Sequence, residues 1–95
     1  MVLVTYDVET SSENGGRRLR KVAKICQNYG QRVQKSVFEC LVEPHQYAEL
    51  RKQLEDAIDM DLDSLRFYLL GSKWTRRVEH VGANPGYNPE GILIT

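Results

Sequence analysis

The sequence predicts an α+β fold, in which an antiparallel sheet carries two helices on one face. Short runs of β-branched and apolar residues alternate along the 95 residues with two segments whose apolar residues recur at helical spacing. The composition, 41% hydrophobic and 27% charged, is typical of a folded globular chain and excludes a disordered one. A chain of this length is sufficient for one domain.

The first strand and the first helix are separated by a loop of turn-forming residues. Residues 2–8 (VLVTYDV) are short, apolar and β-branched, which predicts a buried strand, and residues 9–16 (ETSSENGG) predict the loop. A helical pattern begins at Arg17 and ends at Gly30, a residue type common just after a helix. The predicted buried face of this helix consists of Leu19, Val22, Ala23, Cys26 and Tyr29.

The middle of the chain returns to strand character before a second helix. Residues 31–43 alternate over a length that is long for one strand, so we expect a bend or a tight hairpin near 35–38. Pro44 suits the first turn of a helix, the acidic stretch 55–63 ends that helix, and residues 64–71 form the next strand. The predicted buried positions are Tyr47, Leu50, Leu54, Ala57 and Ile58 in the helix and Leu65, Phe67 and Leu69 in the strand.

The resulting order, β-α-β-β-α-β, is the split βαβ or ferredoxin-like pattern. We assign this domain to residues 1–81, with an extra C-terminal strand at 74–81 where side chains alternate again. The tail, 82–95, is expected to pack on a sheet edge. The edge of a partner protomer's sheet is favoured over the edge of the tail's own sheet. One sheet face remains uncovered and a domain of this size is marginally stable alone, so the sequence predicts a homodimer.

The net charge is zero, but the charges are unevenly distributed. Residues 1–38 carry seven basic and three acidic side chains, whereas residues 39–71 carry three basic and eight acidic ones. A basic face for phosphates and two ordinary solvated helices both explain this distribution. Cys26 and Cys40 occupy apolar positions and are expected to be reduced core residues. The chain has no apolar run long enough for a membrane span and no recognisable signal peptide, so the predicted location is the cytoplasm.

Asp7 is the first candidate functional residue, because it lies at the C-terminal end of the first strand. A carboxylate in this position is exposed at the mouth of the sheet, where a hard cation such as Mg²⁺ finds oxygen ligands. A single carboxylate is weak as a metal site, but a two-fold axis would bring two copies together. The alternative is a structural Asp that caps the following loop through backbone N–H groups.

A basic cluster at the start of the first helix is the second candidate. It consists of Arg17, Arg18, Arg20 and Lys21. Cations at a helix N-terminus are unfavourable with the helix dipole, so their presence needs a reason, and neutralisation of nucleic-acid phosphates is one. Pairing with Glu9 or Glu13 is the alternative.

The strand that leaves the first helix is the third candidate, since it contains Arg32 and Lys35 among hydrogen-bonding side chains. Platforms for single-stranded RNA also place aromatic residues on such strands. Here only Phe38 and Tyr68 could serve, and both are interpreted as core residues.

Other chemistry has no support in the sequence. His45 and His80 are isolated and have no ligand or nucleophile at a suitable spacing. The chain contains no P-loop, GxGxxG, GxSxG or HExxH motif, which argues against nucleotide hydrolysis and acyl transfer.

The segments VTYDVETSS, RRLRKVAKICQNYGQRVQKSVFEC and DSLRFYLLG resemble the Cas-two family of CRISPR proteins, closest to its subtype I-C members. The resemblance covers residues 1–81 and implies a ferredoxin-like homodimer that works with a larger Cas integrase to insert new spacers into CRISPR arrays. Some family members are magnesium-dependent nucleases on RNA or duplex DNA. The resemblance implies a catalytic and metal-binding role for Asp7 and nucleic-acid contacts by Tyr6, Arg17, Arg18, Arg20 and Arg32, with Phe38 also matching a family position.

Two functional hypotheses remain open, with a weaker third. In the first, two Asp7 carboxylates hold magnesium at the dimer axis of an endonuclease. In the second, which we favour, the dimer is a scaffold that holds duplex DNA across a basic face and joins integrase subunits. The third, an RNA-binding or regulatory module without catalysis, is disfavoured because the chain lacks exposed aromatic residues.

Overall fold

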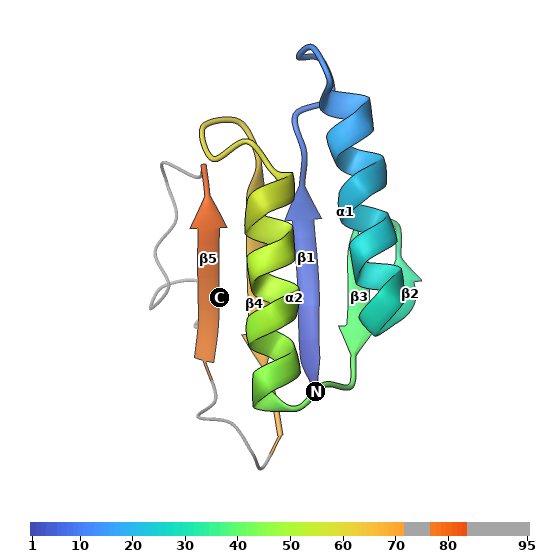
Figure 1. Cartoon of the computed structure of the whole chain (residues 1–95), viewed down its shortest axis with the longest axis vertical. Coiled ribbons are helices and arrows are strands. Elements are labelled where there is room, and N and C mark those ends of the chain that lie inside the picture. The colour runs from blue at the N-terminus through green and yellow to red at the C-terminus, as the bar shows by residue number, and fades with distance from the viewer. Residues whose placement is uncertain (72–76, 84–95) are drawn as a thin grey trace.

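The computed structural model, which describes residues 1–71 and 77–83, contains two helices and a five-stranded sheet (Figure 1). The elements are β1 (Val2–Asp7), α1 (Gly15–Tyr29), β2 (Gly30–Gln34), β3 (Val37–Cys40), α2 (Pro44–Ala57), β4 (Ser64–Leu69) and β5 (Arg77–Gly82). The predicted order of strands and helices is therefore confirmed. Residues 74–76 of the predicted last strand and nearly all of the tail, 84–95, lie outside the described residues.

The sheet has the strand order β2-β3-β1-β4-β5, and every neighbouring pair is antiparallel. The first four strands in this order form the ferredoxin-like arrangement predicted from the sequence. The expected hairpin is present, with its turn at residues 35–36 between β2 and β3. The extra strand, β5, pairs with β4 at the edge of its own sheet. Figure 1 shows α1 and α2 side by side on one face of the sheet.

The core lies between the two helices and this sheet face. Burial alternates along β1 and β4, so that Val4 and Phe67 face the helices while Thr5 and Arg66 face the other way. Every predicted core position of α2 and β4 is buried. On α1, Val22 is buried as predicted. The remaining core residues of α1 are Ile25, which was not predicted, and Cys26, with Leu19 and Tyr29 partly buried against them. Ala23, which was predicted to be buried, is only partly buried.

The described helices include none that is both long and apolar enough to span a bilayer.

Helix α2 begins at Pro44 as predicted, and the side chain of Gln46 accepts a hydrogen bond from the Glu43 amide at 2.8 Å. This bond is part of a capping box, which satisfies amide groups that have no partner within the helix.

Helix α1 begins at Gly15, two residues before the predicted start at Arg17. Asn14 precedes it in the left-handed region with a φ of 67°, and the Gly15 amide donates to the Ser12 carbonyl at 3.1 Å. A Cβ atom on Gly15 would lie 2.3 Å from the Glu9 carbonyl oxygen. Glycine therefore allows the loop after β1 to pack directly against the first turn of α1.

Asp63, immediately before β4, is the one buried charged residue among the described positions, with a side-chain exposure of 0%. Its carboxylate accepts hydrogen bonds from the backbone amides of Glu9 at 2.9 Å and Asp59 at 2.8 Å. Arg18 adds two more bonds to the carboxylate, from Nε at 2.7 Å and from Nη2 at 3.2 Å. The loop after β1, helix α1 and the end of α2 therefore meet at one side chain.

The backbone of Asp63 connects the same point to β5. The Asp63 carbonyl accepts a hydrogen bond from the Ala83 amide at 2.8 Å. Gly82 has a φ of 98°, and a Cβ atom there would lie 2.2 Å from the Asp63 carbonyl oxygen. Only a glycine fits this close approach without strain. All these segments lie at the upper end of the molecule in Figure 1.

The pKa of Asp63 makes this network sensitive to acid. Burial by itself raises the pKa of the carboxyl group, but the hydrogen bonds from Arg18 and from the amides of Asp59 and Glu9 outweigh it and lower the pKa below its ordinary value of 3.8. A carboxyl group whose pKa is lowered by folding stabilises the folded state above its unfolded pKa. That contribution is lost as the pH falls through the folded-state pKa.

We therefore expect Asp63→Asn to lower the free energy of unfolding by roughly 3 kcal/mol at neutral pH, because it leaves the Arg18 charge without its counter-ion. The difference from the unsubstituted protein should shrink as the pH falls below 3.8. Urea unfolding at a series of pH values and one protein concentration measures this. Asp56→Asn, at an exposed acid of α2, is the matched control and should change stability little at any pH. An Asp63→Asn deficit that stays constant from neutral pH to pH values well below 3.8 would contradict this account.

Candidate functional site

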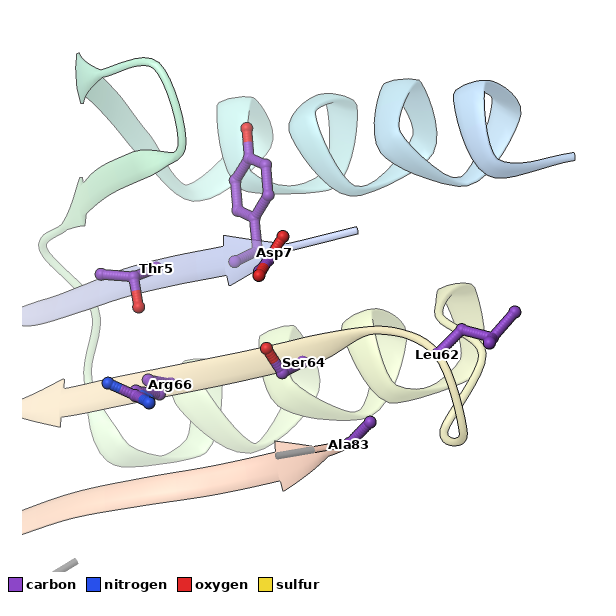
Figure 2. Close-up of a pocket in the computed structure, with 7 residues that line it drawn as sticks. Thr5, Asp7, Leu62, Ser64, Arg66 and Ala83 are labelled. Atoms are coloured by element: carbon purple, nitrogen blue, oxygen red, sulfur yellow. The ribbon is translucent and has the colours of Figure 1, made fainter. Parts of the chain in front are cut away.

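Asp7 is the last residue of β1, and its side chain is exposed on the sheet face that the helices leave open. The register places Asp7 opposite Ser64 and Thr5 opposite Arg66. Figure 2 shows these labelled side chains along two neighbouring strands at the edge of one hollow. The hollow has a volume of about 490 Å³ and is lined by Thr5, Tyr6, Asp7, Leu62, Ser64, Arg66 and Ala83.

The loop after β1 is capped by residues other than Asp7. The Glu9 carboxylate accepts hydrogen bonds from the Ser11 hydroxyl at 2.6 Å and the Ser11 amide at 2.9 Å, and these bonds lower the pKa of Glu9. Asp63 accepts the bond from the Glu9 amide. The Asp7 carboxylate forms no hydrogen bond or ion pair with any residue of 1–71 or 77–83. The described structure thus gives no support to the interpretation of Asp7 as the loop cap.

The chemistry of the groups around Asp7 fits a hard divalent cation, although their number is small. The carboxylate of Asp7 and the hydroxyl groups of Thr5 and Ser64 are oxygen donors of the kind that Mg²⁺ binds. Within the described ranges no three His, Cys, Asp or Glu side chains gather as a metal cluster. The described part of one chain therefore places one carboxylate, that of Asp7, in this hollow, and another copy could supply a second.

Tyr6 contributes to the lining of the hollow, but its ring and the side chain of Arg32 belong to a different group, on the helix side of the sheet. The Tyr6 ring is buried and stacks against Phe38 with 6.2 Å between ring centroids, and its hydroxyl donates to the Lys35 carbonyl at 3.4 Å. The guanidinium of Arg32 lies 5.1 Å from the centroid of the Phe38 ring. Burial raises the pKa of Tyr6, while a hydrogen bond and the charge of Arg32 act in the opposite direction. The structure does not bring Arg32 into the Asp7 hollow.

The three arginines of the basic cluster differ in their surroundings. Arg17 and Arg20 are exposed on α1. Arg18 is half-buried and bonds to Asp63 and to the carbonyl oxygens of Glu9 at 3.2 Å and Glu13 at 3.3 Å. The alternative of pairing with Glu9 or Glu13 is therefore correct for Arg18 in part, through carbonyl oxygens instead of carboxylates. The guanidinium of Arg18 has a structural role, and its predicted contact with nucleic acid stays a prediction.

Sequence reasoning missed two residues of this region. Asp63 lies in an acidic stretch that is typical of a solvated helix end, and no local pattern distinguishes it from Asp59 or Asp61. Arg66 was treated only as part of a strand. Its position opposite Thr5 on the Asp7 face follows from strand alternation, but only once the register between β1 and β4 is known.

Comparison with known proteins now decides the family. The family model of CRISPR associated protein Cas2 matches residues 1–78. The chain belongs to the Cas2 family. The resemblance predicted from the sequence is thus confirmed, while the assignment to subtype I-C stays a prediction.

Two curated relatives match this Cas2-family chain over almost its whole length. A CRISPR-associated endoribonuclease Cas2 from Chlorobaculum tepidum is 61% identical over 94 residues, covering 99% of this chain and 98% of the relative. A CRISPR-associated endonuclease Cas2 from Halalkalibacterium halodurans is 56% identical with the same coverage. The crystal structure of Streptococcus pyogenes Cas2 at pH 6.5 superimposes with a TM-score of 0.68 at 57% identity, covering 74% of this chain and 84% of the other.

Proposed function

We propose that this Cas2-family protein acts in CRISPR spacer acquisition as a homodimer that binds duplex DNA and joins the larger Cas integrase. The observation that supports DNA binding best is the row of exposed basic side chains on α1. This row consists of Arg17, Arg20, Lys21 and Lys24. Its members are spaced three or four residues apart, so they share one side of the helix.

The charges of the α1 row are not explained by contacts within the described part of the protomer. Helix α1 contains no acidic residue, and none of the four side chains forms an ion pair with a residue in the described part of the chain. Arg17 and Arg20 lie near the N-terminus of the helix, where cations oppose the helix dipole. Neutralisation of backbone phosphates compensates for this placement and gives binding that does not depend on base sequence.

The homodimer is supported by the sheet face that the helices leave open. Asp7 and Glu39 are exposed on this face. Most of its other side chains are only partly exposed, and they include Leu3, Thr5, Val37, Ser64, Arg66, Tyr68 and Val78. A second copy placed by two-fold symmetry would cover this face and bring two Asp7 carboxylates toward one another. Among the described strands, β2 and β5 form the two edges of the sheet, and residues 84–95 of a partner would pack on one of these edges.

A second function, metal-dependent endonuclease activity, is supported by the exposed Asp7 carboxylate and by the names of the endonuclease and endoribonuclease relatives. Asp7 from each protomer would hold a divalent cation such as Mg²⁺, which supplies the Lewis acidity needed for phosphodiester hydrolysis of DNA or RNA. The hydroxyl groups of Thr5 and Ser64 can orient a phosphate oxygen or a water molecule by hydrogen bonding. The RNA-binding module without catalysis is less well supported, because Phe38 is fully buried. Tyr68, interpreted from the sequence as a core residue, instead lies half-buried on the open face, because it alternates with the buried residues of β4.

Replacement of Arg17 and Arg20 together by Ala should weaken binding of duplex DNA and flatten its salt dependence. Each lost phosphate contact removes about 0.9 from the slope of log K against log salt, so the double variant should lose about two units. Arg18 is left in place because its substitution would disturb the Asp63 network. Lys52→Ala, at an exposed base on α2, is the matched control and should keep the slope. An unchanged slope in the double variant would place the DNA elsewhere.

Replacement of Asp7 by Ala separates the nuclease from the scaffold. Metal-dependent cleavage should fall by at least about 100-fold, because the carboxylate that would hold the cation is lost. DNA affinity should change little, since the α1 row is intact, and spacer integration with the larger partner should continue. Gel assays of cleavage, binding and integration on one preparation provide the three readouts. Loss of integration in a folded, DNA-binding variant would contradict the scaffold role, and unchanged cleavage would contradict the nuclease.

A further inference from the structure

Two exposed apolar side chains lie close together in the loop between α2 and β4, whose residues 59–62 are here called the tip loop. Met60 is 53% exposed and Leu62 is 45% exposed, while the residues that flank the loop on either side are buried. Leu62 borders the hollow at Asp7, whereas Met60 lies outside it. Figure 2 shows Leu62 beyond the start of β4, past the end of the sheet. The tip loop therefore stays accessible at this end of the molecule when the open face is covered.

Four hydrogen bonds fix the shape of the tip loop. The Asp59 carbonyl accepts from the Leu62 amide at 3.1 Å and from the Asp63 amide at 2.8 Å. The Asp59 carboxylate accepts from the Asp61 amide at 2.9 Å, and the Asp59 amide donates to the Asp63 carboxylate at 2.8 Å. The chain at Met60 is thus held away from the core. A loop that is ordered before it binds loses less entropy when a partner covers its apolar side chains.

The charges around these apolar side chains are all acidic. From residue 53 to residue 65 the sequence contains five acidic residues and no basic one. Two of the acids pair with arginines, at 2.7 Å and 3.3 Å. The other three form no ion pair with the described part of the chain, and these are Asp56, Asp59 and Asp61. A surface of this charge repels the phosphates of nucleic acids and of anionic lipids, so its partner is a protein.

The protein that fits the tip loop has an apolar pocket with basic side chains around it. Apolar side chains that fill a pocket of the partner supply much of the affinity, and charges at the rim determine specificity and association rate. Methionine is enriched in the cores of such interfaces. Figure 1 shows the tip loop at the same end of the molecule as the start of α1. A protein docked there would also meet the DNA that the α1 row is proposed to hold.

We propose that the tip loop is the docking site for the larger Cas integrase, with Met60 and Leu62 in an apolar pocket and Asp59 and Asp61 facing basic side chains at its rim. The inference rests on the integrase partnership proposed above, and it assigns to that partnership a surface of this chain. Asp7 and the basic side chains of the α1 row take no part in this contact. Integrase binding and DNA binding should therefore respond to different substitutions.

The first test measures the Kd of the full-length protein for the purified integrase by isothermal titration calorimetry, without DNA. Replacement of Met60 and Leu62 together by Ser should raise this Kd by at least about 10-fold, the loss expected for apolar anchors. Leu41→Ser is the matched control, because Leu41 is 82% exposed and follows β3 at the other end of β1. This control should change the Kd by less than about 2-fold.

The outcomes separate the docking site from the partnership on which it rests. An unchanged Kd in the double variant would overturn the docking site. Dissociation of the double variant into monomers in light scattering would also overturn it, because Met60 and Leu62 would then belong to the contact between two copies of the chain. Failure of the unsubstituted protein to bind the integrase would instead overturn the partnership itself.

A charge reversal tests the acidic rim. Asp61→Lys should weaken integrase binding by about 5- to 10-fold at low salt and by less at high salt, because screening reduces the repulsion between like charges. The tip loop uses the backbone amide of Asp61 and not its carboxylate, so its hydrogen bonds are kept in this variant. Equal or tighter binding by Asp61→Lys would contradict the basic rim assigned to the partner.

Oxidation of the unsubstituted protein shows what covers the tip loop. The chain has two methionines, Met60 and the 36% exposed Met1, which pairs with Leu70 at the other end of the sheet. Dilute hydrogen peroxide should convert both thioethers to sulfoxides, and mass spectrometry of peptides measures each rate. The integrase should slow oxidation of Met60 by at least about 5-fold and leave Met1 unchanged. Protection of Met60 in the protein alone would overturn the proposal, since the tail or a second copy would then cover the loop.

Discussion

The buried carboxylate of Asp63 determines the geometry of the end of the molecule where the candidate site lies. A carboxylate removed from water is costly unless its oxygens are fully hydrogen-bonded, and here two backbone amides and the Arg18 guanidinium provide those bonds. Each donor comes from a different segment of the chain. The loop after β1, helix α1 and the end of α2 are therefore fixed relative to β4 by one side chain.

This network leaves the Asp7 carboxylate available for other contacts at the adjacent sheet face. Because Glu9 and Asp63 together satisfy the backbone of the loop after β1, Asp7 has no structural task that the described contacts reveal. Arg18 stabilises the fold through its bonds to Asp63, whereas Arg66 belongs to the open face of β4, opposite Thr5. The two aspartates thus differ in their surroundings, since Asp63 is buried and fully hydrogen-bonded while Asp7 is exposed on the open face.

The sequence predicted the order of the elements because apolar periodicity is a local property, and the hairpin near 35–38 and the helix start at Pro44 followed from it. The predicted start of α1 was wrong by two residues, because a glycine at position 15 is typical of a loop. Its close approach to the Glu9 carbonyl becomes visible only in the structure. Asp63 and the special position of Arg18 depend on contacts 45 residues apart in the chain, which no local pattern contains. The position of Arg66 opposite Thr5 likewise required the register between strands.

The carboxyl resonances of the aspartates, observed by carbon-13 nuclear magnetic resonance during a titration with Mg²⁺ at neutral pH, test this division of roles most directly. The Asp7 resonance should shift as the cation binds, whereas the Asp63 resonance should stay in place because its oxygens are already bonded to Arg18 and to two amides. A shift of Asp63 with no response from Asp7 would contradict the account, since it would mean that the buried carboxylate binds the cation and the exposed one does not.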